Sequence, residues 1–289
     1  ILGCRFVRRW WRPYWERLDP DSRRALVITE DTCEYETFKH SPIDPYTGPQ
    51  IKGCLLRRTD GDRLLIKVAH EVSDAGGVKQ IVKIVSYTYS KLAHDPEYRP
   101  EPNVNGDRSI WQVLRHVPWY AYPTILYNYY RVYMFPVLFP LGTIQLPVVA
   151  DNDRTLEFIH RTVNEDLLKC LIQYGRQRNA TLNDVLMAAF FHALTAASDW
   201  DRKSQLRLRI TIDLRRFIPD GNVDSICNLS GMEVVDLGAE LNNDFDYTLM
   251  RISSFMRQRK SQWIGINDFV GLAPLSIFFP HSVMQRIIV

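Results

Sequence analysis

Residues 67–85, KVAHEVSDAGGVKQIVKIV, limit the folds open to this chain more than any other stretch. Apolar residues at 64–66 and 68 lead into them and predict a short, mostly buried strand. After the Ser-Asp-Ala-Gly-Gly turn, apolar residues recur at helical spacing and predict a helix over 77–92. His70 therefore falls where the strand ends and Asp74 where the helix begins. Such junctions place side chains at the edge of a sheet, where clefts tend to lie.

Strands and helices alternate through the rest of the chain. Two apolar runs flank an Asp-Gly pair at 60–61, which predicts a hairpin whose outgoing arm leads to His70. Further strands are predicted over 156–164, 207–214 and 227–237, and further helices over 164–178, 181–198 and 244–263. In the 181–198 helix Thr181 or Asn183 can cap the first turn. Its predicted buried face comprises Val185, Leu186, Ala189, Phe190 and Leu194. The pattern predicts an α/β fold with mixed sheets.

The charge balance and the cysteines exclude several classes of site. With 36 basic and 33 acidic residues among 289, the net charge of +3 argues against a polyanionic partner such as nucleic acid. The five cysteines are scattered and odd in number, with no CxxC pair or histidine-rich neighbour: Cys4, Cys33, Cys54, Cys170 and Cys227. They are interpreted as reduced thiols of a cytoplasmic protein without a metal site. No signal peptide is recognisable, and the ends of the sequence suggest an incomplete chain.

Two segments leave alternatives open. The stretch RFVRRWWRPYWERLD mixes arginines with bulky aromatics, so it could contact a nucleic-acid strand. The alternation of Trp11, Pro13 and Trp15 instead favours a strand with one buried face. Residues 117–149 carry Arg131 as their only charge, but five prolines argue against a membrane span. They could form a buried crossover, which is the default, a lid that binds apolar chains as part of a channel, or a peripheral lipid contact.

The residues at the strand–helix junction suit acyl transfer. A histidine at a cleft edge can take a proton near neutral pH. An aspartate at a helix start can cap the helix or pair with a distant arginine. Gly76 and Gly77 leave backbone N–H groups at the helix N-terminus, where developing negative charge is stabilised. The spacing alone equally allows a packed histidine, a simple cap and a tight turn.

The junction resembles the HHxxxDG signature of the chloramphenicol-acetyltransferase-like superfamily. This superfamily includes condensation domains of nonribosomal peptide synthetases and HxxxD acyltransferases. Residues 209–231, RITIDLRRFIPDGNVDSICNLSG, resemble a later strand–loop–strand of its condensation-like members, and TLNDVLMAAFFHAL resembles the preceding helix. The chain departs from the signature at Ala69, which replaces the first histidine, and at Ala75, which replaces the glycine.

The resemblance implies a fold and a mechanism. The expected fold has two lobes, 1–149 with the HxxxD motif and 150–289, and a channel between them. His70 would be the catalytic base, and Asp74 a structural active-site residue paired with an arginine, for which Arg215 fits better than Arg216. Gly76 would supply the bend, at positive φ, and the backbone donor, because Ala75 disfavours that conformation.

The implied reaction moves an acyl group from a CoA or carrier-protein thioester to a hydroxyl or amine. The thioester, linked through CoA or phosphopantetheine, would be a co-substrate, and neither another cofactor nor a metal is expected. A carrier protein is a potential partner, and the oligomeric state is not indicated. Ala75 also leaves open a catalytically silent relative that acts as a binding or scaffolding module.

Overall fold

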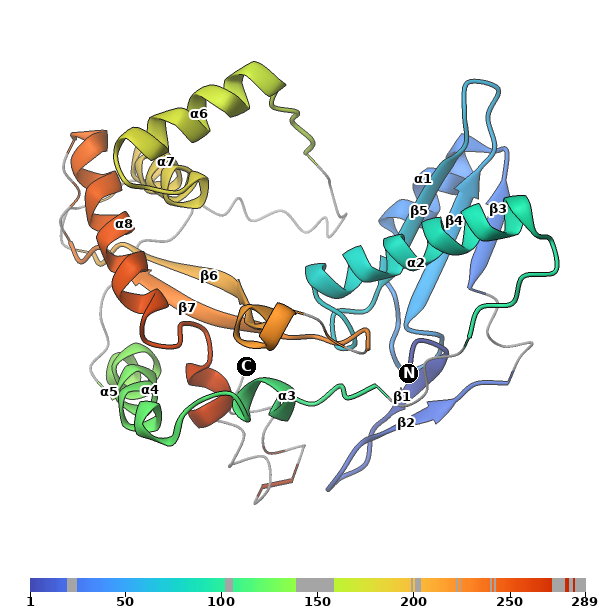
Figure 1. The fold of residues 1–289 in the computed structure, drawn as a ribbon, viewed down its shortest axis with the longest axis horizontal. Coiled ribbons are helices and arrows are strands. Elements are labelled where there is room, and N and C mark those ends of the chain that lie inside the picture. Colours follow the sequence, from blue (N-terminus) through green and yellow to red (C-terminus); the bar gives the residue numbers. More distant parts are fainter. Residues whose placement is uncertain are drawn as a thin grey trace. The chain divides into compact units, whose positions relative to one another are not determined.

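The computed structural model describes residues 1–19, 25–101, 106–138, 159–198, 200, 204–221, 223, 225–239, 241, 243–271, 279–280 and 283. Its contacts divide the described residues into two compact units (Figure 1). The first unit contains Ile1–His116 and Asp213–Ser230, and the second contains Val117–Ile212 and Gly231–Gly271. The predicted lobe boundary at 149/150 lies outside the described residues and stays a prediction, as does a channel between lobes.

The strands of the first unit form a hairpin and a separate mixed sheet. The hairpin pairs β1 (Cys4–Val7) with β2 (Tyr14–Arg17) in antiparallel register. The sheet has the order β3 (Leu26–Thr29), β4 (Ile51–Leu56) and β5 (Arg63–Val68). β3 runs parallel to β4, whereas β4 and β5 form the predicted antiparallel hairpin. Gly61 turns this hairpin at a φ of 123°, a conformation that glycine adopts without steric cost.

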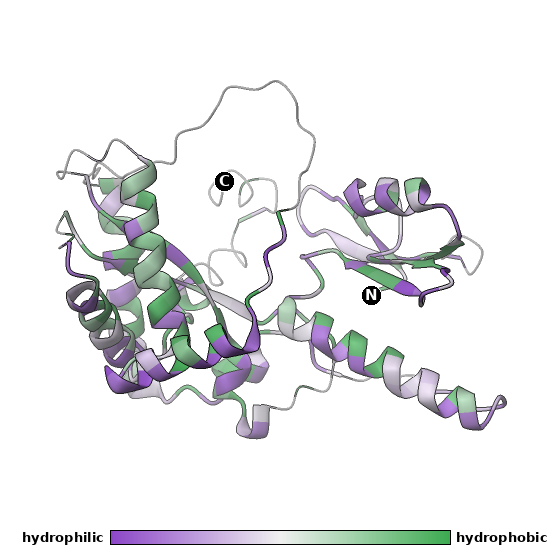
Figure 2. Ribbon diagram, turned by 90° about the horizontal axis from the view of Figure 1, so that it is seen from above, coloured by the Kyte–Doolittle hydropathy of each residue, from purple (hydrophilic) through white to green (hydrophobic). Residues whose placement is uncertain are grey.

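The helices of the first unit include the one that follows His70. They are α1 (Thr32–His40), α2 (Ala75–His94), α3 (Trp111–Leu114) and the 3₁₀ turns η4 (Leu214–Phe217) and η5 (Pro219–Gly221). α2 begins two residues earlier than predicted because Asp74 caps it and accepts from the N–H of Gly77, and it continues to His94. Green apolar residues recur along α2 in Figure 2, but only Gly77 and Ile81 of this helix are buried, so most of its apolar residues stay exposed.

The second unit packs helices with a two-stranded sheet. Its helical elements are η2 (Trp119–Ala121), α4 (Tyr122–Tyr129), the π-helical turn η3 (Tyr130–Met134), α5 (Phe135–Leu138), α6 (Glu165–Gln177), α7 (Leu182–Ala197) and α8 (Phe245–Lys260). β6 (Arg207–Asp213) pairs with β7 (Ser230–Asp236), as the two apolar stretches predict. Of the predicted 156–164 strand, residues 159–164 form no regular element and 156–158 lie outside the described residues.

The α7 helix begins at the predicted cap but presents a different face. Thr181 and Asp184 form a reciprocal capping box. Of the predicted buried face, Val185 and Leu194 are buried, whereas Leu186, Ala189 and Phe190 are exposed, Leu186 by 51% and Phe190 by 43%. The observed buried face instead includes Met187, Ala188 and Phe191. An almost continuous apolar run does not define one face, so packing against α8 selects it.

A buried ion pair lies under the β6–β7 sheet. Arg259 of α8 donates to Oε2 of Glu233 from Nη2 at 2.7 Å and from Nε at 3.1 Å. Both side chains are at most 2% exposed, so removal of either partner would leave the other buried without its ion pair. Among the described helices, none alone has the length and apolarity needed to cross a membrane; α6 and α7 meet that criterion only as a pair bent by 96°.

Candidate active site

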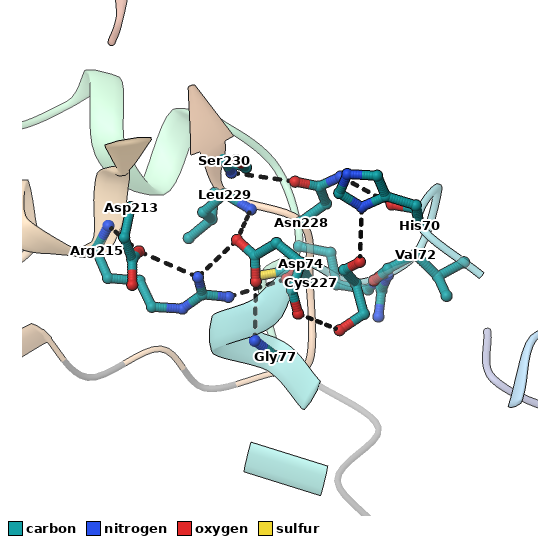
Figure 3. A network of polar contacts seen from close by, with 12 residues as sticks. His70, Val72, Asp74, Gly77, Asp213, Arg215, Cys227, Asn228, Leu229 and Ser230 are labelled. Carbon is teal, nitrogen blue, oxygen red and sulfur yellow. Dashed lines mark hydrogen bonds and ion pairs between the residues drawn. The ribbon is translucent and has the colours of Figure 1, made fainter. Parts of the chain in front are cut away.

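His70 lies on the exposed turn between β5 and α2. Its ring Nδ1 is 3.1 Å from the carbonyl oxygen of Ser73 (Figure 3). A carbonyl oxygen only accepts hydrogen bonds, so this contact assigns the proton of the neutral ring to Nδ1. Nε2 then carries a lone pair and has the form that a general base requires.

Asp74 uses both carboxylate oxygens within the protein. Oδ1 accepts from the N–H of Gly77 at 2.8 Å, and Oδ2 accepts from Arg215 Nη1 at 2.7 Å and from the N–H of Leu229 at 2.9 Å. The side chain is 6% exposed. Burial acts to raise its pKa, but the hydrogen bonds from Arg215, Gly77 and Leu229 outweigh burial and lower the pKa below its usual value. Asp74 is therefore a charged residue that joins two distant segments.

Arg215 is the arginine that contacts Asp74. Its guanidinium also donates to the carbonyl oxygen of Cys227 at 2.9 Å and lies 3.2 Å from Oδ1 of Asp213. Burial acts to lower the pKa of Arg215, yet the contacts with Asp74 and Asp213 raise it overall, so the side chain stays charged. Arg216 is exposed and its guanidinium lies 5.5 Å from the Phe217 ring centroid. Adjacent residues of the η4 turn thus have different environments.

The two glycines at the start of α2 leave room for neighbouring groups. A Cβ at Gly76 would lie 2.5 Å from Arg215 Nη1, and one at Gly77 would lie 3.1 Å from the Cys227 carbonyl oxygen. The predicted bend at Gly76 is wrong, because neither Gly76 nor Ala75 has a positive φ and α2 already begins at Ala75. The Asp74 cap starts the helix without a left-handed residue, so alanine at position 75 meets no backbone penalty. A donor role for the Gly76 N–H stays a prediction.

Two further residues hold the turn, and sequence reasoning did not identify their roles. Asn228 donates from Nδ2 to the His70 carbonyl oxygen at 2.8 Å, and its Oδ1 accepts from the N–H of Ser230 at 3.0 Å. Arg108 donates to the carbonyl oxygens of Val72, at 2.9 Å, and of Ile226. Burial lowers the pKa of Arg108, which no sequence motif marked.

Among the described cysteines, Cys227 belongs to this site, because its backbone carbonyl oxygen accepts from Arg215. His192 contacts Thr248 Oγ1 at 3.2 Å in the second unit. The five cysteines are free thiols, and burial raises the pKa of the Cys54 and Cys227 thiols. Within the described ranges, no group of three or more His, Cys, Asp or Glu side chains could hold a metal ion. The site therefore offers an imidazole, backbone N–H groups and a carboxylate that is paired with an arginine.

Comparison with known proteins finds one related sequence. No protein-family model matches the chain. Bacitracin synthase 3 of Bacillus licheniformis is 24% identical over 233 residues, which are 77% of this chain and 4% of that protein.

Solved structures extend the likeness to the fold. The epimerization domain from the third module of tyrocidine synthetase B matches with a TM-score of 0.64 and 19% identity, over 92% of this chain and 63% of that one. Polyketide synthase associated protein 5 from Mycobacterium tuberculosis matches with a TM-score of 0.60 and 14% identity, over 93% and 63%. A cyclization-docking bidomain of a nonribosomal peptide synthetase from Sorangium cellulosum matches with a TM-score of 0.59 and 18% identity, over 91% and 55%. The chain thus spans less than two thirds of the length of these relatives and has the condensation-domain-like fold of the chloramphenicol-acetyltransferase-like superfamily.

Proposed function

We propose that the chain is an acyltransferase that moves an acyl group from a CoA or carrier-protein thioester to a hydroxyl or amine. One observation carries the proposal: the imidazole of His70, held through Nδ1, leaves its Nε2 lone pair unused beside the N-terminus of α2. The carboxylate that a catalytic histidine commonly uses as a partner is committed elsewhere, because both oxygens of Asp74 are hydrogen-bonded. His70 would therefore act as the base alone, and Asp74 and Arg215 would hold the turn.

The proposed reaction balances without a covalent enzyme intermediate. Nε2 of His70 takes the proton from the acceptor hydroxyl or amine, while the acceptor oxygen or nitrogen attacks the thioester carbonyl carbon. The tetrahedral oxyanion lies where first-turn N–H groups of α2, such as that of Gly76, can stabilise it. Collapse breaks the carbon–sulfur bond, and the leaving thiolate takes the proton back from the imidazolium. The products are an ester or amide and a free thiol.

The named relatives favour a thioester donor. The cyclization-docking bidomain from Sorangium cellulosum comes from a nonribosomal peptide synthetase, and synthetases of this kind work with carrier-protein domains. A carrier-bound acyl or peptidyl group is therefore the first donor to test beside acyl-CoA. The chain is proposed to be cytoplasmic, and either donor would be available to it there.

Release of free thiol tests the proposal. The purified chain is incubated with a panel of acyl-CoAs and carrier-bound acyl groups, with and without alcohols or amines, and thiol is measured over time. Release that needs both substrates is expected, and His70→Ala should lower it about a hundred- to ten-thousand-fold with an unchanged circular dichroism spectrum.

A second histidine offers a matched control. His94, at the other end of α2, is also exposed, and its Nδ1 lies 2.7 Å from the Ser90 carbonyl oxygen. His94→Ala should leave thiol release unchanged. If His70→Ala retains the rate of the unmodified chain, His70 is not the base. Tight binding of a thioester without turnover would favour the silent binding module instead.

A further inference from the structure

The loop between β1 and β2 exposes a compact group of cationic and aromatic side chains. The two strands end their pairing at Val7 and Tyr14, and the intervening loop extends beyond them (Figure 1). Five consecutive residues of this loop are exposed: Arg8, Arg9, Trp10, Trp11 and Arg12. We call these five residues the hairpin tip. Trp10 is 71% exposed and Trp11 is 47% exposed, which is unusual for the largest apolar side chain.

The base of the hairpin is fixed, so the tip is held in place. Phe6 packs edge-on against Trp15, with ring centroids 5.0 Å apart. The N–H of Phe6 donates to the Pro45 carbonyl oxygen at 2.7 Å. Buried Gln50 donates to the carbonyl oxygens of Cys4 and Pro45, at 3.0 Å each. Trp15 of the predicted strand is thus half-buried against Phe6, whereas Trp11, predicted on the same buried face, is exposed.

The charge of the tip is positive, and no carboxylate of the described residues pairs with it. The Arg8 guanidinium lies 4.1 Å from the Tyr46 ring centroid, and that of Arg9 lies 5.2 Å from the Tyr14 centroid. Stacking on a ring orients a guanidinium but leaves its charge in place. In the described part of the chain, none of the three tip arginines forms an ion pair with a carboxylate. Glu16, the first acidic residue after the tip, is held by Arg5 at 2.5 Å.

We propose that the hairpin tip docks on an anionic lipid bilayer, with Trp10 and Trp11 at headgroup depth and the three arginines on lipid phosphates. Indole rings favour the boundary between water and hydrocarbon because one side is apolar and the N–H is polar. Arginines attract anionic lipid, by about 1 kcal/mol each, which is about fivefold in affinity. A projecting tip fits a flat surface, whereas proteins that bind single-stranded nucleic acid use a positively charged groove. This inference does not depend on the proposed acyl transfer.

Sedimentation with vesicles tests the proposal. The 289-residue chain is mixed with vesicles of phosphatidylcholine alone or with 30 mol% phosphatidylserine, in about 0.1 M and 0.5 M salt, and the bound fraction is measured. Binding is expected on the anionic vesicles and should weaken at high salt. The triple variant Arg8→Gln, Arg9→Gln, Arg12→Gln should lose about a hundredfold in affinity. The double variant Trp10→Ser, Trp11→Ser should lose about tenfold.

Two control variants match the tip in charge and in aromatic exposure. Arg57, Arg58 and Arg63 are three exposed arginines around the β4–β5 turn, and changing all three to Gln removes the same charge. Trp119 and Tyr120 are adjacent aromatics, 84% and 68% exposed, with ring centroids 6.2 Å apart. Both belong to the second unit, and changing both to Ser removes exposed aromatic surface that is not part of the tip. Both controls should bind as the unmodified chain does, and a loss equal to that of the tip variants would overturn the proposal.

A measurement on the unmodified chain covers the case in which a variant misfolds. Trypsin cleaves after exposed Arg8 and Arg9, and peptide mass spectrometry reports the cleavage rate. Anionic vesicles should slow cleavage at these two sites but not in the 57–63 turn. Equal cleavage with and without vesicles would refute docking. So would tip-dependent binding of a labelled single-stranded oligonucleotide without any binding to vesicles.

Discussion

The Asp74–Arg215 pair gives the sharpest test of how the site is held together. Changing Asp74 to Ala removes a helix cap, which costs about 1 kcal/mol. It also leaves the N–H of Leu229 without its acceptor, at about 1 kcal/mol. Arg215 is only 8% exposed, so its unpaired charge costs about 3 kcal/mol, the lower end for buried pairs. The lower end applies because Asp213 and the Cys227 carbonyl remain within hydrogen-bond distance. The expected loss, about 5 kcal/mol, would threaten folding.

A double-mutant cycle with more conservative substitutions allows the variants to fold, so that their free energies of unfolding can be measured. Asp74→Asn retains an oxygen for the cap but loses the charge, and Arg215→Met retains length without charge. Because the pKa of Asp74 is lowered in the fold, its contribution is complete above the unfolded value of about 3.9 and is lost as the pH falls through the folded value. Urea unfolding at pH 7 therefore measures the full effect.

The expected coupling between the two changes is about 2 kcal/mol or more. The exposed neighbour provides the control, since Arg216→Met should change the free energy of unfolding by less than about 0.5 kcal/mol. Strict additivity of Asp74→Asn and Arg215→Met would refute the pairing as a source of stability. So would an equal loss in Arg216→Met.

Three further changes probe other contacts. Gly76→Ala should cost about 1–3 kcal/mol of unfolding free energy in urea titrations, because the new Cβ would lie 2.5 Å from Arg215 Nη1; a neutral result would mean that the guanidinium moves freely. Asn228→Ala should lower the thiol-release rate up to about a hundredfold by freeing the His70 turn, while the unfolding free energy falls by about 1 kcal/mol; an unchanged rate would remove Asn228 from the site. Asp268→Asn should raise the unfolding free energy at pH 7 by about 2 kcal/mol, because burial first and then Glu233 raise the pKa of Asp268 to about 6. In the unmodified chain, the folded state binds the Asp268 proton more tightly than the unfolded state between about pH 4 and 6. The stability gained by Asp268→Asn should therefore shrink as the pH falls through that range. A gain that does not depend on pH would contradict the raised pKa as its cause.

The elements with strong local signals were predictable from the sequence. The β4–β5 hairpin, α2, α7 and the β6–β7 stretches depend on periodicity, turn residues and caps, which act within a few positions. The face of α7 was not predictable, because Leu186 and Met187 are equally apolar and only packing against α8 distinguishes them. Elements set by contacts between distant segments are those on which local reasoning is weakest.

For the site as well, local features were predictable and contacts between distant segments were not. The strand–helix junction predicts a cap at Asp74, but the role of Gly76 depends on where a side chain 139 positions further along the chain comes to lie. The predicted bend at Gly76 was wrong because Gly76 has no positive φ. Glycine at this position instead leaves room for the Arg215 guanidinium. Asn228 and Arg108 hold the turn through backbone carbonyl oxygens, which every residue carries, so no residue pattern could mark them.

The long sequence separation within the Asp74 contacts has a consequence for how the protein folds. Its carboxylate bonds Arg215 and Leu229, which are 141 and 155 residues further along the chain. Closing such long loops costs entropy before any contact forms, so the pair belongs to a late stage of folding. At translation rates of about 5–20 residues per second, Leu229 is synthesised about 8–30 s after Asp74. During that interval the cap bond to Gly77 is the only one of the three that the nascent chain can make, and α2 must persist on local interactions alone.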